Sequence, residues 1–133
     1  MGDDRRRLRP ARLGRLRRPD DFPRRAHLYW VRIPAEPGGK QRPALIVSPD
    51  GRNRFATDVL VVPLSTVLRD APTHVRLRPG EGGLPRVSVA KCEQITNLRR
   101  EFIRAGPLGT PLARQRMLQV EKAILRAIGV PVD

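Results

Sequence analysis

The apolar residues of this chain fall in short runs that are separated by Pro, Gly and Asp. From His27 onward, five runs are rich in β-branched and aromatic residues: HLYWVRIP, RPALIVS, TDVLVVPLS, THVRLR and RVSVAKCEQI. Runs of this length and composition predict five strands. The connections between them are too short for crossover helices except near residues 50–57, so we expect mostly antiparallel pairing in a small twisted sheet or barrel.

Near the C-terminus the pattern changes to a helical period. In TPLARQRMLQVEKAILRAIGVP, the apolar positions on one face are Met117, Val120, Ile124 and Ile128. Thr110 suits the N-cap, Pro111 the first helical position, and Gly129 the end of a helix. The pattern predicts an amphipathic helix whose apolar side must be covered by the sheet or by a second subunit. The expected fold is therefore mainly β, of the α+β class.

Residues 1–25 differ in composition from the rest of the chain. They hold ten Arg and four Asp, are interrupted by Pro10, Pro19 and Pro23, and contain too few large apolar residues to form a core. The whole chain, at 133 residues, has the length of one domain. We therefore expect a basic, poorly ordered arm at 1–25 and one folded domain at 26–133.

The chain is strongly basic, with 27 Lys and Arg against 13 Asp and Glu and a net charge of +14. This charge favours a polyanionic partner, with nucleic acid first and an acidic protein second. No apolar run approaches the roughly 20 residues that a membrane span needs, and the start MGDDRRR has no apolar signal core. We expect a soluble, cytoplasmic protein with no membrane partner.

Metal-binding and nucleophilic side chains are scarce. His27, His74 and Cys92 stand alone, and no pair of carboxylates has the spacing of metal ligands, so we predict no metal and no cofactor. Cys92 cannot form an internal disulfide and lies among alternating apolar residues, where a small buried side chain is expected. The loop RPGEGGLPR lacks the Gly-Lys-Ser/Thr of a phosphate-binding loop, and we interpret it as a flexible turn.

The runs YWVRIP, EPGGKQRPALIVSPDGRNR, VLVVPLST and GEGGLPRVSVAKCEQI, followed by an amphipathic helix, together resemble the MazF/PemK toxins of bacterial type II toxin-antitoxin systems. The resemblance covers about residues 27–129. It implies a dimeric SH3-like barrel that cleaves single-stranded RNA at short sequences and is neutralised by an acidic antitoxin along its surface. Two alternatives stay open: a CcdB-like DNA gyrase inhibitor on the same fold, and a basic barrel that binds RNA without cleaving it.

The resemblance also implies site residues. Arg42 matches the arginine of the family's Arg-Pro at the start of the second strand. Ser65, with Thr66 beside it, matches the hydroxyl residue that closes the third strand, and Gln94 matches the glutamine after the fifth.

Further matches lie near the fifth strand and in the first loop. Lys91 and Glu93 stand where some relatives hold an Arg and an Asp implicated in cleavage, and Glu36 is the candidate for the family's loop glutamate. The chain departs from the pattern in two places. Ala26-His27 replaces the usual Gly-Asp or Gly-Glu opening of the first strand, and the loop PAEPGGK is shortened.

Metal-free cleavage of RNA needs a group to take the proton of the attacking ribose 2′-hydroxyl, another to protonate the leaving oxygen, and a third to hold the extra negative charge. Arg42 suits the last task because its planar guanidinium matches phosphate oxygens, and Pro43 keeps its backbone extended. Ser65 can donate to a phosphate or 2′-oxygen, and Gln94 can position a phosphate or a base edge.

For the general base, Glu36 and Glu93 rank equally, with His27 and His74 behind them. Sequence readout is expected from loops 35–41, 52–56 and 66–72. The cations expected to bind RNA phosphates are Lys40, Arg52, Arg54 and Arg69. With so few aromatic residues in the chain, we expect Trp30 to lie in the core rather than to stack on a base.

Overall fold

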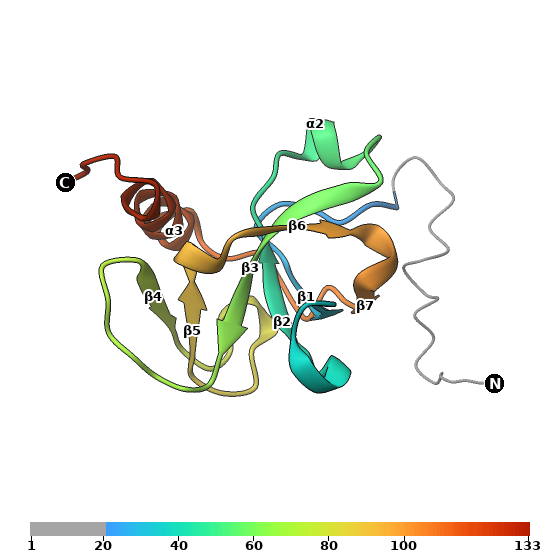
Figure 1. The fold of residues 1–133 in the computed structure, drawn as a ribbon, viewed down its shortest axis with the longest axis horizontal. Helices are drawn as coiled ribbons and strands as arrows, with labels where there is room; N and C mark the ends of the chain where they lie inside the picture. Colours follow the sequence, from blue (N-terminus) through green and yellow to red (C-terminus); the bar gives the residue numbers. More distant parts are fainter. Residues whose placement is uncertain (1–20) are drawn as a thin grey trace.

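The apolar runs form strands, and the protein is mainly β with a C-terminal helix (Figure 1). The computed structural model describes residues 21–133. The strands are β1 (Leu28–Arg32), β2 (Gln41–Ile46), β3 (Asp58–Ser65), β4 (His74–Leu77), β5 (Ser88–Lys91), β6 (Thr96–Arg99) and β7 (Ile103–Ala105). The helices are α2 (Asp50–Asn53) and α3 (Arg114–Ala127), and the 3-10 turns are η1 (Pro37–Gly39), η2 (Glu81–Gly83), η3 (Cys92–Gln94) and η4 (Arg100–Phe102).

All the strand pairs are antiparallel, which confirms that prediction. The strand order is β4-β5-β3-β2-β1-β7, with β6 also paired to β3. β3 is the central strand: one edge pairs with β2, while the other pairs with β6 along its first half and with β5 at its end. Within residues 21–133 no ladder joins β6 to β7, so hydrogen bonding does not close the sheet into a barrel.

The structure has two strands more than the five predicted. The sequence predicts one strand for RVSVAKCEQI, but β5 ends at Lys91, where the backbone turns (φ −94°, ψ 85°) into η3. β6 follows as a separate strand in which only Leu98 is buried. A strand with one buried residue has no period-two signal, so only its pairing with β3 reveals it.

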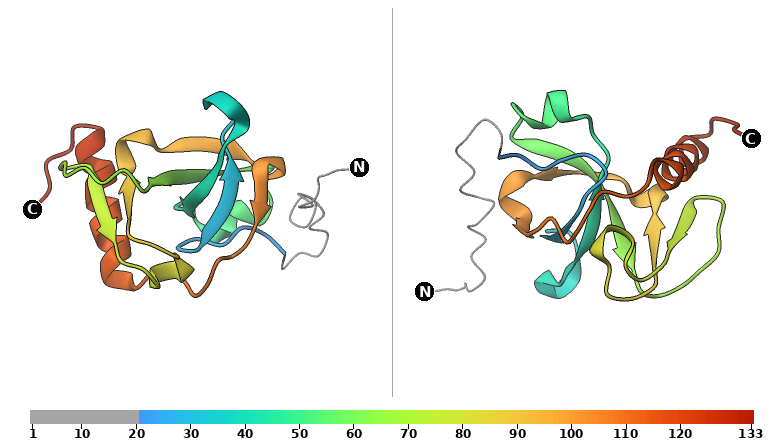
Figure 2. Two further views of the ribbon diagram at one scale, coloured as in Figure 1. Left: turned by 90° about the horizontal axis from the view of Figure 1, so that it is seen from below. Right: turned by 180° about the vertical axis from the view of Figure 1, so that it is seen from behind.

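Alternation along the strands builds two cores on opposite faces of the sheet. The first core includes Leu28, Leu45, Val62, Leu64, Leu77, Ala90, Met117 and Val120. The second includes Tyr29, Val31, Ala44, Ile46, Val59, Val61, Leu98 and Ile103. Neighbours such as Leu28 and Tyr29 belong to different cores, as the two-residue period of a strand requires. α3 covers the first core and lies against β4 and η3 (Figure 2).

α3 confirms the predicted C-terminal helix, but its start differs from the prediction. The helix begins at Arg114, not at Thr110, because the residues before it bond to another part of the chain: Leu108 and Leu112 donate backbone hydrogen bonds to the carbonyls of Leu28 (2.9 Å) and Ala26 (2.8 Å). Ile128 lies beyond its end and is exposed. No helix in the described part of the chain is long and apolar enough to cross a membrane.

The last residues of the predicted arm pack against the domain. Phe22 is buried, and the backbone N–H of Arg25 donates to Asp50 Oδ1 (2.7 Å). The Arg25 side chain donates to the carbonyl of Val47 (2.6 Å) and forms an ion pair with Glu121 on α3. The predicted boundary at residue 25 therefore falls inside a packed segment, while arm residues 1–20 lie outside the described residues.

Cys92 is completely buried in the first core, which confirms its predicted role as a small hydrophobic residue. Burial, and to a lesser extent the nearby Glu93 carboxylate, raises the pKa of the thiol to about 12. The thiol is therefore protonated at neutral pH and does not act as a nucleophile.

Candidate functional site

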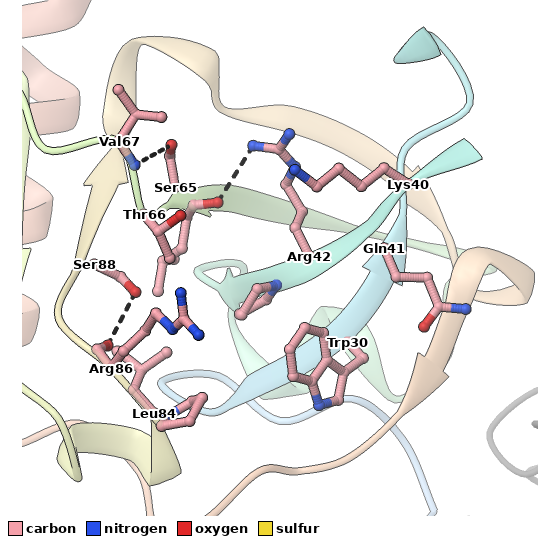
Figure 3. Close-up of a pocket in the computed structure, with 13 residues that line it drawn as sticks. Trp30, Lys40, Gln41, Arg42, Ser65, Thr66, Val67, Leu84, Arg86 and Ser88 are labelled. Carbon is pink, nitrogen blue, oxygen red and sulfur yellow. Dashed lines mark hydrogen bonds between the residues drawn. The ribbon is translucent and has the colours of Figure 1, made fainter. Parts of the chain in front are cut away.

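A pocket of about 350 Å³ opens at the C-terminal end of β3 (Figure 3). Its walls come from β1, β2, the segment after β3 and the segment before β5. The polar lining residues are Lys40, Gln41, Arg42, Ser65, Thr66, Arg86 and Ser88, and the apolar ones are Trp30, Pro43, Leu64, Val67, Leu84 and Pro85. Three cationic side chains therefore share one small cavity, which is a suitable arrangement for binding a phosphate chain.

Arg42 is held by both neighbouring elements. The register pairs Ala44 with Pro63, so Arg42, two residues earlier on β2, stands opposite Ser65 at the end of β3. Arg42 Nη1 donates to the carbonyl of Leu64 (3.3 Å), and Arg42 Nε lies 2.9 Å from Glu36 Oε1. These contacts fix the guanidinium beside the Ser65 hydroxyl.

The contact between Arg42 and Glu36 is an ion pair without a hydrogen bond. Although Nε and Oε1 are close, both atoms are buried and neither has a hydrogen-bond partner within residues 21–133. The short distance establishes the charge interaction, and the missing bond reflects its poor angle. Nε therefore faces Glu36, and Arg42 Nη2, which makes no hydrogen bond within residues 21–133, is the donor that a bound oxyanion can use.

The Ser65 hydroxyl closes the turn after β3. Its oxygen accepts a hydrogen bond from the backbone N–H of Val67 (3.0 Å), as in other turns built by Ser or Thr side chains. A hydroxyl that accepts one bond still has its own proton to donate. Figure 3 shows Ser65 and Arg42 at the same end of the pocket.

The segment 78–86, interpreted from sequence as a flexible turn, is instead firmly packed. Glu81 accepts hydrogen bonds from Arg116 of α3 (2.8 and 3.0 Å) and from the backbone N–H of Arg78 (2.7 Å). The hydrogen bonds from Arg116 are the main reason that the pKa of the Glu81 carboxyl lies below its usual value. Gly83 has φ +90°, and a Cβ there would lie 2.4 Å from the carbonyl oxygen of Leu108. The segment is fixed, and so are the pocket residues that follow it.

Glu93, Gln94 and Lys91 do not line the pocket. Ser65 pairs with Val89 of β5, whereas Val61 pairs with Thr96 of β6, so η3 lies beside the middle of β3 rather than its end. The structure therefore separates these three predicted site residues from Arg42 and Ser65 within one chain.

Glu93 is engaged in a local network. Its carboxylate accepts from Thr73 Oγ1 (2.9 Å) and lies 3.1 Å from Nε2 of His74, whose Nδ1 donates to the carbonyl of Arg69 (2.9 Å). Burial raises the pKa of Glu93, but the hydrogen bonds from His74, from its own backbone and from Thr73 outweigh burial and lower it. A carboxylate stabilised in this way is a weak proton acceptor.

The predicted phosphate-binding cations divide into two groups. Lys40 lines the pocket, but Arg52, Arg54 and Arg69 do not. The Arg52 side chain donates hydrogen bonds to the carboxylate (2.5 Å) and to the backbone carbonyl (2.8 Å) of Asp58, at the opposite end of β3. Arg54 lies over the ring of Phe55 (5.7 Å).

Trp30, expected in the core, is half-buried and lines the pocket. It pairs with Pro43 in the middle of β1 and lies on the same face as Leu28, but it is not part of the first core. Gln41, Arg86 and Ser88 are pocket residues that sequence reasoning missed. The available signal for Arg86 and Ser88 was their position as the first and third residues of the last predicted strand, RVSVAKCEQI.

Within residues 21–133 no group of three or more His, Cys, Asp and Glu side chains has the arrangement of a metal site. His27 contacts the carbonyl of Gly109 (3.3 Å) and does not line the pocket. The pocket itself offers three cationic side chains and the hydroxyls of Ser65, Thr66 and Ser88. Glu36 does not line the pocket and is connected to it through its contact with Arg42. This combination can bind a phosphodiester and polarise it.

A model of the PemK-like, MazF-like toxins of type II toxin-antitoxin systems matches residues 24–128. The chain belongs to this family. The match includes every residue of the pocket and all seven strands. The family resemblance inferred from the sequence is thereby confirmed.

Named relatives are endoribonucleases. The chain is 27% identical to the endoribonuclease MazF of Staphylococcus epidermidis over 112 residues, 80% of this chain and 92% of that one. It is 30% identical to the endoribonuclease MazF1 of Mycobacterium bovis over 90 residues, 68% and 81% of the two chains.

Solved structures agree with this relationship. A mycobacterial endoribonuclease superposes with a TM-score of 0.68 at 28% identity, over 84% of this chain and 95% of that one. A mycobacterial endoribonuclease in complex with its cognate antitoxin gives the same TM-score at 29% identity, over 84% and 99% of the two chains. A relative with this fold has thus been solved in complex with its antitoxin.

Proposed function

We propose that this MazF-like toxin is a sequence-specific endoribonuclease that cleaves single-stranded RNA by attack of a ribose 2′-hydroxyl on the adjacent phosphate, without a metal. The observation that carries the proposal is the pocket in which Arg42, Ser65 and Thr66 stand together with Lys40. The named relatives favour RNA cleavage over gyrase inhibition.

Arg42 holds the charge that develops during cleavage. The 2′-oxygen attack places additional negative charge on the phosphate oxygens, and a fixed guanidinium next to them stabilises that charge without rearranging. The ion pair with Glu36 and the hydrogen bond to the Leu64 carbonyl support this role, because they position the side chain and leave Nη2 as a donor. Ser65 donates a hydrogen bond to a phosphate oxygen or to the 2′-oxygen. The bond from phosphorus to the 5′-oxygen breaks as the cyclic phosphate forms, and the leaving 5′-oxygen takes a proton from water.

We assign proton abstraction to Glu36. Of the two carboxylates considered, Glu36 is the one in contact with Arg42, whereas Glu93 is occupied by Thr73 and His74. Replacement Glu36→Gln keeps the shape and removes the base, so we expect the maximal cleavage rate to fall at least tenfold while RNA binding persists. Single-turnover cleavage with saturating enzyme measures this rate directly.

Residues outside the pocket contribute to RNA binding in this proposal. Gln94 and Lys91, beside the middle of β3, and the loop cations Arg52, Arg54 and Arg69 contact flanking parts of the strand rather than the cleaved bond. Alanine variants at these positions are then expected to weaken binding in a salt-dependent way without changing the maximal rate.

We further propose a homodimer that is inhibited by an acidic antitoxin. Leu118 (49% exposed), Leu125 (36%) and Ile128 (66%) leave apolar surface uncovered on and just after α3, and the net charge of +14 suits an acidic partner. Sedimentation at micromolar concentration tests the dimer, and monomer alone would refute it.

The proposed fold is an SH3-like barrel whose hydrogen bonding is left open between β6 and β7. β6 pairs with β3, and β7 pairs with β1. The two ends of segment 96–105 are therefore bound to two different strands of the same curled sheet. Amide hydrogen exchange tests the open arrangement. Strong protection of the β7 amides that point away from β1 would indicate that a further ladder closes the barrel.

The function is tested with purified protein, a long RNA and excess EDTA. We expect cleavage at a few short sequences, with products ending in a 2′,3′-cyclic phosphate or a 3′-phosphate, and no cleavage when the nucleotide before the cut is 2′-deoxy. A strict requirement for added magnesium, or cleavage of the matching DNA, would contradict the mechanism. Stalled gyrase-DNA complexes with intact RNA would instead support the gyrase alternative.

A further inference from the structure

We propose that Arg86 binds a backbone phosphate of the RNA next to the scissile one, while Arg42 acts on the scissile phosphate itself, an inference that rests on the proposed ribonuclease function. Arg86 lies between η2 and β5, lines the pocket and is exposed. Figure 3 shows its guanidinium group pointing into the pocket.

The strand order places the two arginines on opposite sides of the reacting groups. β3 runs between β2, which carries Arg42, and β5, which Arg86 precedes, and Ser65 ends β3 between them. Two strand spacings separate the outer backbones by about 10 Å. An RNA strand lying across the end of β3 can therefore contact both guanidinium groups with successive phosphates.

The charge pairing differs between the two residues. Arg42 is compensated by Glu36 at 2.9 Å, and its side chain is 21% exposed. Within residues 21–133 no hydrogen bond or ion pair engages the Arg86 side chain, so its charge and all five N–H donors are available. An accessible guanidinium whose charge is not paired binds the phosphate of the substrate in the ground state. A fixed guanidinium whose charge is already paired with a carboxylate interacts chiefly with the additional negative charge of the transition state.

The backbone of Arg86 is held although its side chain is free. Its carbonyl accepts a hydrogen bond from Ser88 Oγ (3.1 Å), and the preceding segment is anchored by Glu81 to Arg116. A fixed attachment point lowers the ordering cost of binding a phosphate. The arrangement therefore predicts that Arg86 contributes to substrate affinity and not to the chemical step.

The test compares Arg86→Ala with Arg78→Ala, a matched control in the same segment whose side chain is 80% exposed and outside the pocket. The binding probe is a labelled 12-nucleotide RNA of mixed sequence with every 2′-hydroxyl methylated, which the proposed chemistry cannot cleave. For Arg86→Ala we expect roughly tenfold weaker binding, as for loss of a hydrogen bond to a charged group, and a slope of log K against log salt that is smaller by about 0.7. Arg78→Ala should bind within twofold of the parent protein.

Cleavage of an unmodified RNA gives the second readout. Arg86→Ala should raise KM about as much as it weakens the probe, with kcat within twofold, and Arg86→Lys should restore the salt slope because the charge returns. Equal binding by Arg86→Ala and Arg78→Ala would overturn the proposal, and so would a loss of kcat with unchanged affinity. If the parent protein binds the probe but cleaves no RNA, the ribonuclease function fails while the binding comparison still decides whether Arg86 contacts phosphate.

Discussion

The two ends of β3 carry similar polar residues but arrange them in opposite ways. At the Asp58 end, the carboxylate accepts from Arg52 (2.5 Å) and Asn97 (3.1 Å), and these bonds, Asn97 first, lower the pKa of Asp58. At the Ser65 end, no hydrogen bond or ion pair within residues 21–133 engages Arg42 Nη2 or the Arg86 side chain, and both residues line the pocket. The first end is complete by itself, and the second is complete only with a ligand.

A buried network extends the first end into the protein. Ser48 and Asn53 are buried, and Ser48 Oγ donates to Asn53 Oδ1 (2.5 Å) while Asn53 Nδ2 donates to the carbonyl of Ser48 (2.9 Å). Ser48 Oγ also accepts from the backbone N–H of Leu60 (3.0 Å), so the network pins α2 to β3. Satisfied polar groups of this kind stabilise a fold, while unsatisfied ones in a cavity indicate a binding site.

The largest expected effect comes from a substitution in the pocket, at the Ser65 end of β3. Arg42→Ala should lower the cleavage rate by on the order of 100-fold or more, because one fixed charge donor to the transition state is lost, while RNA affinity falls only slightly. Arg42→Lys should recover little of the rate, since an ammonium lacks the two-pronged geometry. Single-turnover kinetics provide the measurement.

Arg69→Ala provides the contrast for that experiment. Arg69 is an exposed loop arginine outside the pocket, so its loss should weaken RNA binding and its salt dependence with turnover nearly kept. If Arg42→Ala and Arg69→Ala both cost affinity and neither costs turnover, Arg42 is only part of a basic surface.

The next largest effect comes from a substitution in the buried network at the Asp58 end of β3. Asn53→Ala removes both bonds to Ser48 and leaves buried polar groups unpaired, so the free energy of unfolding should fall by about 2 kcal/mol. Urea denaturation measures the loss. Cleavage by the remaining folded protein should be unchanged, and a rate loss as large as that of Arg42→Ala would show that the two ends are not separate.

The smallest effect concerns the support of the pocket. Glu81→Gln should reduce stability by about 1 kcal/mol at neutral pH, because the bidentate contact with Arg116 loses its charge and the carboxylate is partly exposed. Since folding lowers the pKa of Glu81, its contribution is present above the unfolded pKa and disappears as pH falls through the folded one. The difference between the variant and the parent should therefore begin to shrink as pH falls below the unfolded pKa of a glutamate, and should vanish only below the lower, folded pKa of Glu81.

Glu101→Gln is the matched control for pH-dependent denaturation. The Glu101 side chain is 59% exposed, and its carboxylate lies 3.3 Å from Arg99, whose side chain is 68% exposed, so its removal should change stability less. Equal losses in the two variants at neutral pH would mean that the contact between Glu81 and Arg116 has no special role in holding the segment.

The sequence by itself determined the strands β1 to β5, their antiparallel pairing, the terminal helix and the family. These depend on local side-chain periodicity and on short connections, both of which can be read along the chain. It also identified Arg42, Ser65, Thr66 and Lys40, whose positions at strand ends fall together in the structure. Their chemical roles stay predictions.

Only the tertiary structure decided which strand ends meet. Because β3 lies between β2 and β5, the residues before β5 join the pocket and bring Arg86 into it, while η3 turns Glu93 and Gln94 away. Trp30 lies on the same sheet face as Leu28 but lines the pocket, because it is not part of the first core. Strand order and the coverage of a face depend on contacts between distant residues, and no local pattern records them.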